Sequence, residues 1–180
     1  MGKRCVSTVI ENLPELPGPD CGDWRLLHTR SRQEKAVAAD LRAMGIAYFL
    51  PIVVQPRYYG RRKLLVDLPL YPGYVFLRGS LDDAYSADRT GRIAQIIQVS
   101  DQRQLDWELR NLHLALTRQA PLEPYPFLKV GRKVEVRSGP FRGVQGIIEE
   151  NDGRTLSLQV QMLGRGVSLE IDGALLEPLE

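Results

Sequence analysis

The chain of 180 residues contains only two cysteines and two histidines. Cys5 and Cys21 both lie close to the start of the chain, and His28 and His113 are far apart in the sequence. Two such cysteines do not make a disulfide framework, and neither histidine has a partner at metal-ligand spacing. The sequence therefore predicts no metal site and no cofactor.

Long hydrophobic runs are lacking as well. No stretch approaches the roughly 20 apolar residues of a membrane-spanning helix, and the first residues are too short in apolar length for a signal peptide. A cytoplasmic protein with no membrane partner is expected. The chain also has no phosphate-cradling loop and no Ser/His/Asp arrangement, which argues against an enzyme.

Charge is distributed unevenly along the chain. The formal net charge is +2, but residues 22–118 hold 15 Lys/Arg against 10 Asp/Glu, whereas residues 119–180 hold 7 against 9. The surplus in the middle block is where phosphate contacts would be sought. It is small enough that an ordinary solvated surface explains it equally well.

Proline and glycine divide the chain into four parts. Pro14, Pro17, Gly18 and Pro19 resist regular structure, and three prolines between Pro121 and Pro126 favour an extended linker. We expect a flexible N-terminal leader, a middle domain, a proline-rich linker and a C-terminal domain. Their respective bounds are 1–21, 22–118, 119–127 and 128–180.

The C-terminal block has a period of two. Short runs such as Leu156–Met162 and Val167–Ile171 alternate apolar and polar residues, and Gly164-Arg165-Gly166 separates them as a turn. Such close spacing predicts a small antiparallel barrel. A barrel of this size leaves little room for a catalytic cavity, so it indicates binding.

The middle block alternates strand and helix patterns. Apolar residues recur at helical spacing in 33–44, and Leu105, Leu109, Leu112 and Leu116 form a second helical stripe after the candidate N-cap Asp101. This stripe is too short for a coiled coil and is expected to be core. Strands are expected at 24–28, 46–54, 64–66, 74–77 and 93–99, a hairpin tip at 58–63 and a short helix at 81–89. The pattern predicts an α+β domain.

The segment Leu70–Leu77, with the sequence LYPGYVFL, is the most unusual part of this block. Pro72-Gly73 bends the chain directly before a strand, in which Tyr74 and Phe76 share one face. The two faces are either simply core, or Tyr71, Tyr74 and Phe76 form an aromatic contact surface of the kind enriched at protein interfaces.

Residues 24–172 resemble the NusG family of transcription elongation factors. The resemblance is carried by WRLLHTRSRQEKAVAADL and PLYPGYVFL in the middle block, and by VEVRSGPFRGVQGIIEENDGRTLSLQV and MLGRGVSLEID in the C-terminal block. It implies an α+β protein. The NGN domain has an antiparallel sheet with helices and is RNP/ferredoxin-like, and a small SH3-like β-barrel, the KOW domain, follows it.

The resemblance also implies a function and partners. In the family, the NGN domain binds the clamp helices of RNA polymerase, bridges the polymerase cleft and suppresses pausing and termination. A monomer that acts in this way is expected here. The polymerase-binding residues carried over are Leu26, Tyr71, Pro72, Tyr74 and Phe76.

The resemblance also suggests contact with nucleic acid for three basic clusters. Family members face the non-template DNA of the transcription bubble from the start of the first helix, and helix N-termini favour phosphate. For each cluster, a solvated surface and contact with nucleic acid stay equally open. The clusters are Arg30, Arg32 and Lys35; Arg61, Arg62 and Lys63; and Arg89 and Arg92.

The resemblance implies that the KOW domain recruits a second partner through Phe141, Leu163, Gly164 and Arg165. In NusG-like KOW domains a Phe usually precedes the Gly-Arg pair and helps to contact Rho and a small-subunit ribosomal protein. Leu163 keeps an apolar contact but lacks the ring, which puts Rho binding in doubt and leaves ribosome binding open. Together with the hairpin before PLYPGYVFL, this favours a specialised RfaH-like antitermination factor over a housekeeping NusG that acts with Rho.

RfaH-like proteins can refold the KOW domain as a helical hairpin, and this sequence argues against that switch. Glycines and Pro140 occur throughout the segment; each interior Gly costs a helix about 1 kcal/mol and Pro about 3 kcal/mol. We therefore predict a β-barrel. An RNA- or ribosome-binding KOW protein is the alternative of another class, but such a protein has no need of the aromatic surface.

Overall fold

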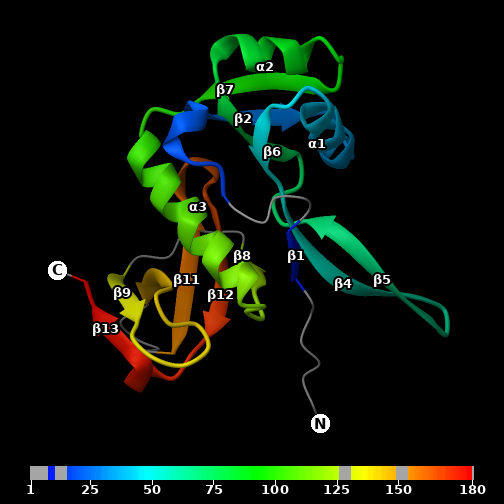
Figure 1. Ribbon diagram of the computed structural model, residues 1–180. Helices are drawn as coiled ribbons and strands as arrows, with labels where there is room; N and C mark the ends of the chain where they lie inside the picture. Colours follow the sequence, from blue (N-terminus) through cyan, green and yellow to red (C-terminus); the bar gives the residue numbers. More distant parts are fainter. Residues whose placement is uncertain (1–7, 11–15, 126–130, 149–153, 180) are drawn as a thin grey trace. The chain divides into compact units, whose positions relative to one another are not determined.

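The computed structural model describes residues 8–10, 16–125, 131–148 and 154–179 (Figure 1). The chain divides into two compact units, of which the first contains Val9–Arg103 and the second Gln104–Glu180. Both are built on sheets; the first also carries two helices and the second holds most of a third. The α+β prediction is confirmed.

A four-stranded sheet with the order β3-β6-β2-β7 forms the centre of the first unit. Its strands are β2 (Asp23–Thr29), β3 (Ala47–Phe49), β6 (Tyr74–Gly79) and β7 (Ile93–Gln98). The helices α1 (Glu34–Ala43) and α2 (Leu81–Asp88) follow the first and third of these strands in the chain. This βαββαβ order is that of the ferredoxin-like fold.

One face of this sheet packs against the two helices. Leu27, Val75 and Leu77 share a buried core with Val37, Ala38 and Leu41 of α1 and with Ala84 and Ala87 of α2. The helical spacing of these apolar residues in α1 and α2 is the reason that each helix presents an apolar stripe. Ser80 begins α2 with a capping box, since its hydroxyl accepts from the backbone N–H of Asp83 and the Asp83 carboxylate accepts in return.

A second, three-stranded sheet contains β1 (Thr8–Ile10), β4 (Pro51–Tyr59) and β5 (Arg62–Pro69). The pair β4 and β5 is inserted between β3 and β6, and Figure 1 shows it as a long ribbon that extends away from the four-stranded sheet. The sequence predicted one strand over 46–54. The structure divides it at Leu50 between two sheets, because Pro51 has no N–H for the ladder that β3 belongs to.

The predicted leader also differs from the structure where it is described. Thr8–Ile10 form β1, and Pro19–Cys21 form a 3₁₀ turn. The buried guanidinium of Arg78 donates to the backbone oxygens of Pro17 and Gly22 at 2.8 and 3.0 Å, which fixes the chain before β2. Residues 1–7 and 11–15 lie outside the described part.

The second unit is a six-stranded antiparallel sheet with the order β13-β9-β10-β11-β12-β8. Its inner strands are β9 (Arg132–Val136), β10 (Gln145–Ile148), β11 (Thr155–Val160) and β12 (Arg165–Glu170). The edges are β13 (Leu176–Pro178) and β8 (Glu123–Tyr125). The predicted period of two is confirmed in β9, where Val134 and Val136 are buried.

Two features of this unit were not anticipated. Within the proline-rich segment, Glu123–Tyr125 form a strand that pairs with Gly166–Ser168 of β12 and so adds an edge strand to the sheet. The long helix α3 (Gln102–Thr117) belongs from Gln104 onward to this unit, whereas the sequence predicts it as part of the domain 22–118. Leu105, Leu109, Leu112 and Leu116 of the predicted stripe are buried, as expected for core residues.

Candidate binding surfaces

Strand register places three of the predicted polymerase-binding residues, Leu26, Tyr74 and Phe76, on one face of the four-stranded sheet. Leu26 of β2 pairs with Phe76 of β6, and Phe49 of β3 pairs with Phe76 from the other side. His28 pairs with Tyr74 in the same way. Because directly paired residues lie on the same face, these side chains form one surface opposite the helices α1 and α2.

Aromatic contacts hold this surface together. The ring of Tyr71 meets Phe76 edge-on at a centroid distance of 6.1 Å, and Phe49 lies 6.3 Å from Phe76. Tyr74 stacks on His28 at 5.0 Å. Offset and edge-on pairs of this kind add about 0.5–1.5 kcal/mol each beyond area burial.

The five predicted residues differ in exposure. Leu26, Tyr71 and Phe76 are exposed by 2% or less, Tyr74 is half-buried and Pro72 is exposed. Pro72 and Tyr74 are thus the two that a partner reaches directly. The other three form the packed base on which Tyr74 sits.

The turn before β6 fixes the position of Tyr74. Residues 71–74 make a turn closed by the N–H of Tyr74 donating to the oxygen of Tyr71 at 3.1 Å, and Gly73 has a φ of +87°. Proline followed by a residue of positive φ is the pattern of a type II turn, where glycine is favoured. The sequence prediction of a bend is confirmed.

Glu34 anchors this turn to helix α1 and was not singled out from the sequence. Its side chain is 7% exposed, and its Oε1 accepts from the N–H of Gly73 at 2.6 Å. The carbonyl of Gly73 in turn accepts from the N–H of Thr29 at 2.8 Å. No sequence pattern links an acid in the first turn of a helix to a glycine 39 positions away, so only the fold reveals it.

Tertiary structure brings two of the three basic clusters together. The backbone N–H of Arg30 donates to the oxygen of Arg92 at 2.8 Å, which joins the segment before α1 to the segment before β7. Arg30, Arg32 and Lys35 are exposed there. The Arg92 guanidinium donates to Asp40 at 3.0 Å and to Gln33 at 2.8 Å, so part of its positive charge is neutralised.

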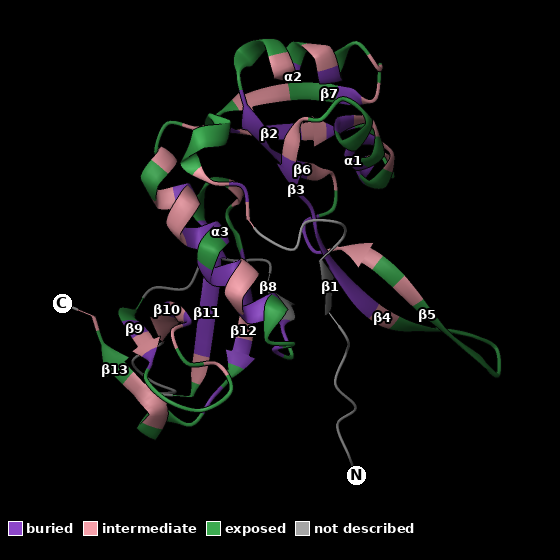
Figure 2. Cartoon of the chain, viewed as in Figure 1, coloured by how far each residue is buried: buried purple, intermediate pink, exposed green. Residues whose placement is uncertain are grey.

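The third basic cluster lies on the β4–β5 hairpin. Gly60 has a φ of +60° and Arg61 completes the turn between Tyr59 and Arg62, which confirms the predicted tip. Arg61, Arg62 and Lys63 are all exposed. They lie in the turn and at the start of β5, at the end of the hairpin that Figure 2 shows as exposed.

The predicted KOW partner residues lie in two loops of the second unit. Gly164, with a φ of +62°, ends the short 3₁₀ turn Gln161–Leu163 and starts β12 at Arg165, as expected for a hairpin turn. Leu163 is half-buried and Arg165 is exposed. Phe141, in the loop between β9 and β10, is half-buried.

Helix α3 contacts the second unit's sheet next to both loops. Its Glu108 carboxylate is 4% exposed and accepts from the N–H of Gln161 at 3.2 Å through each oxygen. At its end, the Arg118 guanidinium donates to the backbone oxygens of Pro140 and Arg142, which flank Phe141.

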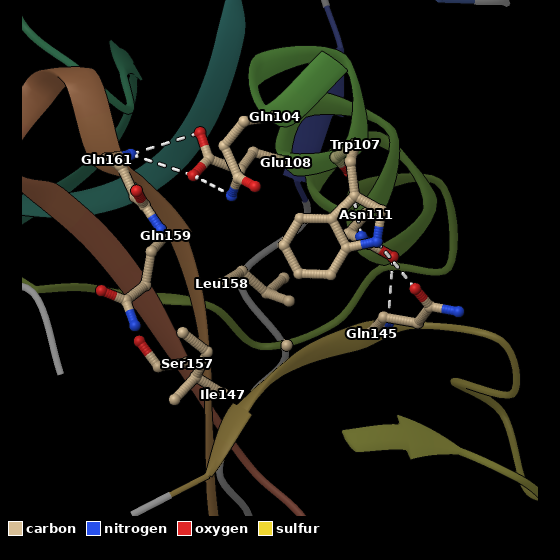
Figure 3. Close-up of a pocket in the computed structure, with 11 residues that line it drawn as sticks. Gln104, Trp107, Glu108, Asn111, Gln145, Ile147, Ser157, Leu158, Gln159 and Gln161 are labelled. Carbon is tan, nitrogen blue, oxygen red and sulfur yellow. Dashed lines mark hydrogen bonds between the residues drawn. The ribbon is translucent and has the colours of Figure 1, made fainter. Parts of the chain in front are cut away.

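A polar network fills the middle of the same contact (Figure 3). Trp107 Nε1 donates to Gln145 Oε1 at 2.8 Å, and the N–H of Gln145 donates to Asn111 Oδ1 at 2.9 Å. Lys133 lies 4.7 Å from the centroid of the Trp107 ring. A cavity of about 10 Å³ lies beside these residues, which is at the lower limit for one water molecule. The spacing of the leucines predicts the buried apolar face of α3, but it does not predict the polar contacts of Trp107 and Asn111 with Gln145.

The described residues contain neither a metal-binding cluster nor a membrane-spanning helix. Within residues 8–10, 16–125, 131–148 and 154–179, no group of three or more His, Cys, Asp or Glu is placed to hold a metal ion. Over that same part of the chain, no helix has the length and hydropathy needed to cross a membrane.

The fold and its surfaces define an NGN-like α+β domain with an aromatic sheet face and a basic hairpin, followed by a β-rich region consistent with a KOW domain. Residues 22–105 match the family model described as "Transcription termination factor nusG". The chain is 29% identical over 166 residues to the transcription termination/antitermination protein NusG of Helicobacter pylori, covering 83% of this chain and 94% of the relative. Proteins of the same name from Borreliella burgdorferi and Deinococcus radiodurans are 23% and 26% identical, cover 83% of this chain and are themselves covered over 94% and 95% of their length. The chain is thus similar to NusG proteins over 83% of its length, and residues 22–105 match the NusG family model.

Proposed function

We propose that this protein is a transcription termination/antitermination factor that binds RNA polymerase through its first unit. The observation that carries the proposal is the likeness to NusG proteins over 83% of the chain, in both units and in the same order. The family model covers the segments that build the four-stranded sheet, from β2 to β7.

The proposed polymerase contact is the aromatic face of the sheet. Exposed Pro72 and half-buried Tyr74 stand on the packed base of Leu26, Tyr71 and Phe76. A rigid aromatic anchor on an apolar base is typical of the residues that dominate binding energy at interfaces. We assign the clamp helices of the polymerase as the partner, so that the factor bridges the clamp and suppresses pausing and termination.

The joined basic segments before α1 and β7 are proposed to face the non-template DNA. Arg30, Arg32 and Lys35 are exposed there, and Arg89 is exposed at the end of α2. Contacts of this kind bind phosphate without sequence preference and are weakened by salt. Arg92 is expected to contribute least, because Asp40 already accepts from its guanidinium.

For the second unit we propose a recruiting role, with the small ribosomal subunit or Rho as the partner. Arg165 is exposed and Leu163 and Phe141 are half-buried, so an apolar and basic contact is available at these loops. The ring-less Leu163 favours the ribosome over Rho.

A binding measurement with core RNA polymerase tests the proposal. The full-length protein is immobilised, and polymerase capture is compared between the unaltered chain, Tyr74→Ala and Tyr85→Ala. Tyr85 is a matched control because it is 51% exposed on α2, away from the proposed contact. Tyr74→Ala is expected to weaken binding by about 2 kcal/mol, or roughly 30-fold in Kd, and Tyr85→Ala to leave it unchanged.

Phe76→Ala is the wrong substitution for this test. Phe76 is fully buried, and emptying such a site costs about 3–5 kcal/mol of folding free energy. Failure of the unaltered protein to capture polymerase would contradict the proposed function. Capture that is equally strong with Tyr74→Ala would contradict only the assigned surface.

A further inference from the structure

The tip of the β4–β5 hairpin has a composition that folding does not require. Residues 56–65, here called the arm, are all exposed. The arm includes four cationic and four large apolar or aromatic side chains and no acidic one. They are Arg57, Arg61, Arg62 and Lys63, and Tyr58, Tyr59, Leu64 and Leu65.

The exposure of these apolar side chains is high. Tyr58 is 68% and Tyr59 59% exposed, and Leu64 and Leu65 are 52% and 70% exposed. Nearer the sheet, β4 is buried at Ile52, Val53 and Val54. The change from buried to exposed along one ribbon means that the arm's side chains are available to a partner rather than to the core.

Register shows how the arm is arranged. Tyr58 pairs with Lys63 and Pro56 with Leu65, so these four lie on one side of the ribbon. Tyr59 pairs with Arg62 and Arg57 with Leu64, so these four lie on the other side. Each side therefore presents one tyrosine ring directly beside one cation.

We propose that the arm binds single-stranded nucleic acid, with Tyr58 and Tyr59 stacking on bases from the two sides of the ribbon. An aromatic ring with a neighbouring cation is the combination that single-strand binders use, because the ring stacks on an unpaired base while the cation meets its phosphate. Bases within a duplex are already stacked on each other and are not available to tyrosine rings. The inference rests on the proposed function in one respect only: the transcription bubble is taken as the source of the single strand.

A protein partner fits the arm less well. Tyrosine and arginine are also enriched at protein interfaces, but four cations without an acid would need a strongly acidic partner. A polynucleotide supplies one negative charge for each residue along its length, which matches the charge of the arm. Binding of a protein at the arm is therefore treated as an outcome that contradicts the proposal.

The test is fluorescence anisotropy of the full-length protein with labelled 12-mers of oligo(dT), oligo(rU) and duplex DNA. The variant Tyr58→Leu/Tyr59→Leu is expected to lose about 30-fold in single-strand affinity, at roughly fivefold for each ring. Tyr58→Phe/Tyr59→Phe keeps the rings and is expected to stay within about twofold. Tyr85→Leu removes an exposed tyrosine outside the arm and is expected to change nothing.

Salt dependence provides a second readout. If all four cations contact phosphate, the logarithm of the binding constant should fall against the logarithm of salt concentration with a slope of about −3 for a single strand. Arg61→Gln/Arg62→Gln should reduce that slope by about 1.4. Arg103→Gln/Arg110→Gln removes the same charge from exposed positions of α3 and should leave the slope unchanged.

Several results would overturn the proposal. They are no measurable single-strand binding by the unaltered chain, duplex bound as tightly as the single strand, or full affinity in Tyr58→Leu/Tyr59→Leu. Loss of polymerase capture without loss of oligonucleotide binding in that variant would also overturn it, in favour of a protein partner. Preference for oligo(dT) or oligo(rU) identifies the source as the non-template strand or the transcript.

The two proposals fail separately. Polymerase capture that is normal in a protein with no affinity for the oligonucleotides would contradict the arm's assignment and leave the proposed function standing. Single-strand binding in a protein that does not capture polymerase would contradict the proposed function and leave the arm's assignment standing.

Discussion

At the residue scale, the turn before β6 depends on a side chain that the sequence does not point to. Pro72 and Gly73 predict the bend, and the φ of +87° at Gly73 confirms it. What holds the bend against α1 is the Glu34 carboxylate, which accepts from the N–H of Gly73. A charged acceptor with 7% exposure loses much of its hydration on folding. Loss of this hydrogen bond therefore lowers the free energy of unfolding more than loss of one at the surface.

Replacing Glu34 by alanine should lower the free energy of unfolding by about 1.5–3 kcal/mol, because the N–H of Gly73 loses a charged acceptor. Urea unfolding measures this change. Lys35→Ala, one position on and exposed, serves as the control and is expected to stay within about 0.5 kcal/mol. Equal stability of the two variants would show that the Glu34 hydrogen bond does not hold the turn.

At the element scale, the sequence predicts the apolar face of α3 but not the contacts of its polar side chains. The spacing of Leu105, Leu109, Leu112 and Leu116 predicts a buried helix face, and all four are buried. The spacing does not say what the neighbouring polar side chains contact. Trp107 and Asn111 bind Gln145 of β10, and Glu108 binds the segment after β11, so this part of α3 packs with the C-terminal sheet.

A double-mutant cycle on Trp107→Phe and Gln145→Ala tests this contact. Phenylalanine keeps most of the ring but removes the Nε1 donor, so the coupling free energy between the two positions should be about 1 kcal/mol. Chemical denaturation followed by circular dichroism provides the four stabilities. Arg110, whose guanidinium binds Asp106 within the helix at 2.6 Å, supplies the comparison Arg110→Phe/Gln145→Ala, for which no coupling is expected.

On the scale of the whole molecule, two units of different composition share one chain. The first carries the aromatic sheet face and the basic arm, and the second carries the six-stranded sheet with the two loops proposed to bind a second partner. The second unit is strand-rich in the structure, in line with the glycines and Pro140 that disfavour a helix.

The intact protein is therefore expected to keep strands in its C-terminal part. Backbone chemical shifts of the full-length chain in solution should be those of strands for Arg132–Val136, Gln145–Ile148, Thr155–Val160 and Arg165–Glu170. The shifts of Gln102–Thr117 should be helical and serve as the internal reference. Helical shifts in the strand segments would contradict the prediction.

The sequence by itself determined most of the elements and their order, because hydrophobic period and turn chemistry are local. It did not predict the short strands Thr8–Ile10 and Glu123–Tyr125, which form by pairing with distant segments. The helix in 33–44, the hairpin tip at Gly60 and the turn at Gly164 follow from neighbouring residues alone. It also limited the candidate surface to the aromatic segment around Tyr74.

Tertiary structure decided everything that depends on distant residues. It placed Leu26 beside Phe76 through strand register, and it buried both of them while leaving Tyr74 half-exposed. It brought Arg30 to Arg92 and partly neutralised Arg92 with Asp40. It also exposed Tyr58 and Tyr59 on the arm, although their segment reads as an ordinary β-hairpin. Burial and charge pairing depend on which elements meet, and the local pattern of one strand or helix does not contain that information.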